Sequence, residues 1–185
     1  MAVEIPDYLS VEGKNLGDRT PVAVRIIGDM DDVARDIARV MMEAFWKARD
    51  AGRNVTMIVP VGPVDQFPVL AELINRQRAD WSDVLLVNMD EYLTDDDQWV
   101  DLDHPLGFRG FMDRQFYGLI DAELAPKPEN RVFPDPHDPA AIGRIIAERG
   151  GVDVCLGGIG INGHMAFNEP PEPGETVSAE EFAAR

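Results

Sequence analysis

Short apolar runs alternate with longer helical patterns along this chain, and few classes of fold accommodate such an alternation. Four mostly apolar runs, rich in Val, Ile and Leu, occupy residues 22–27, 55–59, 84–88 and 152–156. Continuous apolar runs of this length are typical of strands that are buried on both faces. We therefore expect these four runs to form strands of one parallel sheet, because helical patterns separate them.

The segments between the apolar runs repeat their apolar residues at three-to-four spacing, which predicts helices over 31–51, 67–78, 108–120 and 138–148. Asp31 and Asp32 favour a helix start, Gly52 marks its end, and Asp138 is the expected N-cap of the fourth helix. The order predicts an α/β fold: a Rossmann-like parallel sheet with helices on both faces and right-handed crossovers.

At 185 residues the chain has the length of one domain. We expect a single α/β domain over 1–185, with 1–20 as an N-terminal extension and 171–185 as a truncated or flexible tail. The fold would then be incomplete at the C-terminus, because a parallel sheet needs both faces covered and so short a tail would not cover it.

Charge and cysteine content exclude several classes of protein. The chain has 34 acidic and 17 basic residues and a formal net charge of -17, which opposes binding to a phosphate backbone and so to nucleic acid. No stretch has the length and apolarity of a membrane span. The lone Cys155 fits a reducing cytoplasm and is expected to be buried at the end of an apolar run. The sequence leaves a homo-oligomer open.

Unusual residues follow three of the predicted strands. They are Pro60–Pro63, Asn88–Tyr92, and the glycine-rich run 157–164 that ends in His164. In open parallel sheets, ligands bind beyond the carboxyl ends of the strands, so these segments should lie along one rim. Glycine-rich backbone can point its N–H groups at an anion, and histidine changes charge near neutral pH. We therefore expect the chemical site here.

Two other interpretations of the glycine-rich run are weaker. Gly158, Gly160 and Gly163 match the spacing of a dinucleotide-binding fingerprint, but that motif needs a helix to begin within it. Three prolines follow at 170, 171 and 173, so no long helix is available. A metal held by His164, Glu169 and Asp90 is a further alternative, although the spacing of these residues matches no recognised metal motif.

Three motifs resemble the glucosamine-6-phosphate deaminase (isomerase) family, within the larger group that includes 6-phosphogluconolactonases. They are NMDEYL at 88–93, HPLGFRGFM at 104–112 and GGIGINGHMAFNEP at 157–170, and the similarity runs in order from about residue 22 to 170. The ending of the last motif favours the deaminase branch. The resemblance implies a Rossmann-like fold and a cofactor-free reaction in which an amino sugar phosphate opens, isomerises from aldose to ketose and loses ammonia.

The resemblance also implies roles for individual residues. Asp90 would be the base that moves a proton between C2 and C1, and His164 would assist ring opening with Glu169 as its carboxylate partner. Asn162, where the family often has aspartate, would orient the imidazole by a hydrogen bond. The expected substrate-binding residues are Gly62, Glu91, Gly158, Gly160 and Gly163.

The sequence departs from the family pattern in two further places. The loop at 62–66 lacks the usual hydroxyl side chains and brings Asp65 close to the expected phosphate. The chain also ends at Arg185, where the family fold continues, so a fragment, a processed chain or a completing partner is expected. Two alternatives therefore remain beside the deaminase: a non-catalytic sugar-binding or regulatory relative, and a 6-phosphogluconolactonase-like hydrolase.

Overall fold

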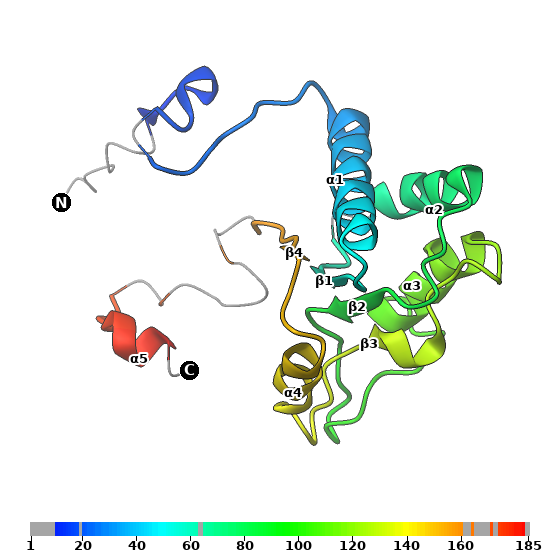
Figure 1. Ribbon diagram of the computed structural model, residues 1–185. Coiled ribbons are helices and arrows are strands. Elements are labelled where there is room, and N and C mark those ends of the chain that lie inside the picture. The colour runs from blue at the N-terminus through cyan, green and yellow to red at the C-terminus, as the bar shows by residue number, and fades with distance from the viewer. Residues whose placement is uncertain are drawn as a thin grey trace.

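The computed structural model describes residues 10–18, 20–62, 65–160, 164, 171 and 174–183. Figure 1 shows the path of the chain through its helices and strands. In order, the elements are η2 (Gly13–Asn15), α1 (Met30–Asp50), β1 (Thr56–Val59), α2 (Gln66–Gln77), β2 (Leu85–Asn88), α3 (Phe108–Gln115), η3 (Tyr117–Leu119), η4 (Pro128–Asn130), β3 (Arg131–Val132), α4 (Ala141–Glu148), β4 (Val154–Cys155) and α5 (Ala179–Ala183).

The described strands form one sheet in the order β3-β2-β1-β4. Every pairing within it is parallel, with β1 lying between β2 and β4. Parallel neighbours require crossover connections, and α2, α3 and α4 lie in the connections between β1 and β2, β2 and β3, and β3 and β4. The predicted α/β fold with a parallel sheet is therefore confirmed.

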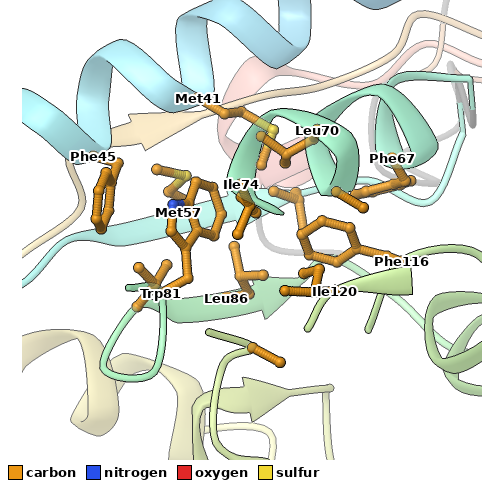
Figure 2. Packing of buried hydrophobic residues seen from close by; sticks show 14 of the residues in the cluster. Met41, Phe45, Met57, Phe67, Leu70, Ile74, Trp81, Leu86, Phe116 and Ile120 are labelled. Atoms are coloured by element: carbon orange, nitrogen blue, oxygen red, sulfur yellow. The ribbon is translucent and has the colours of Figure 1, made fainter. Parts of the chain in front are cut away.

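The hydrophobic core lies between the sheet and the pair α1 and α2. Met57 of β1 pairs in register with Leu86 of β2, and both side chains are fully buried in this core. Figure 2 shows them beneath Met41 of α1, with Trp81 close by. Trp81 stacks on Phe45 with ring centroids 5.5 Å apart. In Figure 1, α4 lies on the opposite side of the sheet, so helices flank both faces.

The first apolar run differs from the prediction. Residues 22–27 are extended but belong to no strand, and the side chains of Val22 and Ile26 are each 65% exposed. Figure 1 shows this segment leading into α1 away from the sheet. Apolarity favours burial, but a strand also needs a hydrogen-bonded neighbour, and none of the described strands pairs with this segment. The two-residue strand β3, in contrast, lies outside the four apolar runs that were predicted to be strands.

Two details at the C-terminal side of the sheet are also corrected. Cys155 is exposed rather than buried, because it lies on the short edge strand β4 and pairs with Ile58, on the sheet face away from the core. Helix α4 is capped by Ala140 instead of Asp138, whose carboxylate pairs with Arg144. Within the segment 171–185, α5 forms a short helix with Glu180 and Glu181 in its first turn.

Candidate active site

A cleft of about 770 Å³ opens at the carboxyl ends of the strands. Its walls include Gly62 after β1, Asp90 after β2, and 157–160 after β4. The volume lies in the range of small-molecule sites, roughly 300–1,000 Å³. The three segments expected along one rim therefore do line a common cleft.

Asp90 and His164 both line this cleft, although they follow different strands and are far apart in sequence. Burial raises the pKa of the Asp90 carboxyl above its ordinary value, and the neighbouring charge of Glu91 raises it further. A carboxylate whose pKa is moved toward neutrality is better suited to act as a general base. Their catalytic roles remain predictions.

Packing against the His164 imidazole explains why position 160 is a glycine. A Cβ added to Gly160 would lie 2.3 Å from both Cε1 and Nε2 of His164, so the imidazole rests directly on this backbone. The Gly160 N–H also donates to the His164 carbonyl oxygen over 2.9 Å. Gly160 therefore makes room for the imidazole, which is a function distinct from the predicted contact with substrate.

The remaining predicted glycines and side chains fall into two groups. Gly158 and Gly62 line the cleft, as a substrate-binding role requires, and that role remains a prediction. Asn162, Gly163 and Glu169 lie outside the described residues. Within the described part of the chain, no three His, Cys, Asp or Glu side chains converge as a metal site would require.

The prediction that Glu91 contacts substrate does not fit the structure. Its side chain is 1% exposed and is not among those lining the cleft. Instead, its carboxylate accepts from the backbone N–H groups of Phe108 and Arg109, over 2.8 and 2.7 Å, at the start of α3. These groups have no partner within the helix, so an anion there is stabilised. Glu91 is thus an N-terminal cap of α3 supplied from another segment.

The apolar wall of the cleft was not predicted from the sequence. Val33 and Ile37 of α1 form one part of it, and the other part comes from 105–108 and Phe111. The motif at 104–112 contributed only to the family resemblance. Its three apolar residues around Gly107 could have indicated this wall. None of the described residues that line the cleft is Lys or Arg.

No protein-family model matches the chain. It is 35% identical over 152 residues to a glucosamine-6-phosphate deaminase of Cellvibrio japonicus, covering 80% of this chain and 54% of the relative. A second glucosamine-6-phosphate deaminase, from Caenorhabditis elegans, is 32% identical over 146 residues, covering 76% of this chain and 52% of the relative. The chain thus spans about half the length of the curated relatives it matches.

Among solved structures, the chain is similar to a monomeric glucosamine-6-phosphate deaminase described as a missing link of the NagB superfamily. The TM-score is 0.63 with 24% sequence identity, over 78% of this chain and 58% of the other. This likeness shows the shared fold. On the evidence of the curated relatives, which are 35% and 32% identical, the chain belongs to the glucosamine-6-phosphate deaminase family and spans about half the length of these relatives.

Proposed function

We propose that the protein is an amino-sugar-phosphate isomerase and deaminase that acts on glucosamine 6-phosphate or a close analogue. The observation that carries this proposal is the cleft in which Asp90 and His164 lie together. It occurs in a fold shared with a solved deaminase and in a chain related to curated deaminases. The substrate is a small molecule, which the cleft volume accommodates.

The proposed reaction begins with ring opening. His164 passes a proton to the ring oxygen while the anomeric hydroxyl loses one, giving an open-chain aldehyde. The aldehyde makes the C2 hydrogen acidic, and Asp90 takes it and returns it to C1. As C1 gains this proton, the C2 amine becomes an imine and one N–H proton passes to the C1 oxygen, which becomes a hydroxyl. Water then adds at C2, and ammonia leaves to give a ketose phosphate.

The glycine-rich loop supplies the electrostatic part of the proposal. Between the two proton transfers, negative charge develops on the C1 oxygen. Backbone N–H groups fixed around this position stabilise such charge better than water does, because they need no reorganisation. Gly157 and Gly158 both line the cleft and are therefore placed to contribute.

Phosphate recognition is the point at which this chain differs from its family. Asp65 occupies the N-cap position of α2 but makes no capping hydrogen bond with its side chain. The first N–H groups of α2 thus remain suitable for an anion. We propose that these amides contribute to phosphate binding.

A cytoplasmic location is also part of the proposal, and the single cysteine supports it. None of the described helices is long and apolar enough to cross a membrane.

Ammonia release from glucosamine 6-phosphate tests the proposal. The wild-type protein should release ammonia, and Asp90→Asn should reduce the rate by about 10²–10⁴-fold, the usual contribution of a general base. Asp95→Asn is the matched control, because it makes the same change at an exposed loop position and should leave the rate unaltered. Sugar phosphate binding without turnover would support the regulatory relative, and acid release from a sugar lactone would support the hydrolase.

A further inference from the structure

Glu91 joins two segments that both line the cleft. It directly follows Asp90 after β2, and its carboxylate binds the first turn of α3. That turn and the residue before it place Gly107 and Phe108 in the cleft wall. Across the same junction, the Tyr92 ring packs on the Phe108 ring with centroids 5.1 Å apart.

The bonding capacity of this buried carboxylate is taken up by donors of the protein itself. One oxygen accepts from the N–H groups of Tyr92 and Phe108, each over 2.8 Å. The other accepts from the backbone N–H and the Nε of Arg109, over 2.7 and 3.2 Å. A buried carboxylate needs such compensation, and four donors hold it in one orientation.

Arg109 extends the junction to a third segment. Its guanidinium lies 4.5 Å from the centroid of the Trp99 ring and donates to the carbonyl oxygen of Val100. Trp99 in turn donates its Nε1 proton to the carbonyl oxygen of Pro134 over 2.7 Å. The start of α3 is therefore anchored to Trp99 and Val100, neither of which lines the cleft.

We propose that Glu91 is a positioning residue, whose carboxylate fixes Asp90 against the apolar wall of the cleft by joining the end of β2 to the start of α3. The inference rests on the proposed function, because it assigns Glu91 a part in the reaction without contact with substrate. It predicts two separable effects, one of geometry and one of charge.

The geometric effect depends on the length of the side chain. Glu91→Asp keeps the negative charge but shortens the side chain by one methylene, so one carboxylate can no longer reach both N–H groups of α3. Since a displacement of about 1 Å can reduce a rate by about 10²-fold, we expect kcat to fall by about 10- to 100-fold. KM should change much less, because Glu91 does not touch the substrate.

The charge effect acts on the titration of Asp90. Among the described residues, Tyr92 and His164 are the other titratable groups that line the same cleft, and Arg109 on α3 is the cation that contacts Glu91. Glu91→Gln leaves these unchanged and removes one negative charge, so the pKa of Asp90 should fall toward its ordinary value. Glu91→Asp should leave that pKa closer to the wild-type value.

The experiment combines ¹³C NMR titration of the Asp90 carboxyl, assigned by its absence in Asp90→Asn, with ammonia-release kinetics. Wild type, Glu91→Gln and Glu91→Asp are compared with Glu72→Gln, which makes the same change on an exposed side chain of α2. Glu72→Gln should match wild type in both measurements. If Glu91→Gln does not fold, the kcat and KM of Glu91→Asp still test the geometry.

The outcomes separate the two proposals. A wild-type protein that releases no ammonia contradicts the proposed function, while the Asp90 titration still reports on Glu91. If wild type is active and both Glu91 variants keep its kcat and its Asp90 titration, changing only the melting temperature, then Glu91 is merely structural and the inference is wrong.

Discussion

Replacement of Gly160 by alanine tests the packing of the His164 imidazole and, through it, the proposed role of this side chain. The added Cβ would lie 2.3 Å from two ring atoms of His164, whereas ordinary contacts begin at 3.4 Å, so the ring must retreat by about 1.1 Å. A displacement of about 1 Å can cost about 10²-fold in rate, so we expect kcat/KM for ammonia release to fall by about that factor. The backbone at Gly160 is outside the left-handed region and tolerates alanine.

Gly143→Ala is the matched control, because a Cβ there meets no atom within 4 Å. Gly143 lies inside α4, so this variant should keep full activity and gain roughly 0.5–1 kcal/mol of stability. Urea unfolding of both variants separates loss of fold from loss of activity. If Gly160→Ala folds and retains activity within about threefold of wild type, catalysis does not depend on the position of the imidazole over Gly160, and the expected rate loss from its displacement is refuted.

Three further predictions concern stability. Gly110→Ala would place a Cβ 1.8 Å from the carbonyl oxygen of Leu102, so urea unfolding should show a loss of about 3 kcal/mol or more. Trp81→Ala removes a fully buried side chain that packs between Phe45 and Phe116 and should cost about 3–5 kcal/mol in the same assay; a loss below about 1 kcal/mol would contradict this packing. Because burial raises the pKa of Asp90, its favourable contribution exists at low pH and is lost as pH rises through the raised value. Asp90→Asn should therefore melt above wild type at about pH 7, and the difference should close below about pH 3.9, the ordinary pKa of the carboxyl; a lower melting temperature for the variant at neutral pH would contradict it.

The central strands could be predicted from the sequence because apolarity and pairing agree there. The runs at 55–59 and 84–88 contain β1 and β2, which lie beside each other in the sheet. The run at 22–27 has a similar apolar character, but strand formation depends on a neighbour that local sequence does not encode. β3 was missed for the opposite reason, since two residues between prolines carry no periodic signal.

The candidate site was predictable where it follows from topology. Parallel strands bring their carboxyl ends to one edge, and this placed Asp90 and His164 in a common cleft. The position of Glu91 was not predictable, because its partners Phe108 and Arg109 are 17 and 18 residues away and belong to a different element. From the sequence alone, an acidic residue beside a catalytic candidate is readily interpreted as a substrate-binding residue. Only the fold shows which groups its side chain contacts.

The catalytic proposal depends on Asp90 and His164 acting on the same bound amino sugar. NMR titration with glucosamine 6-phosphate can follow both residues at once, through the ¹³C signal of the Asp90 carboxyl and the ¹⁵N signals of the His164 imidazole. Both sets of signals should move with the same midpoint concentration, because one ligand occupies the cleft between them. A ligand that shifts only one of the two residues, or shifts them with different midpoints, would contradict the proposal.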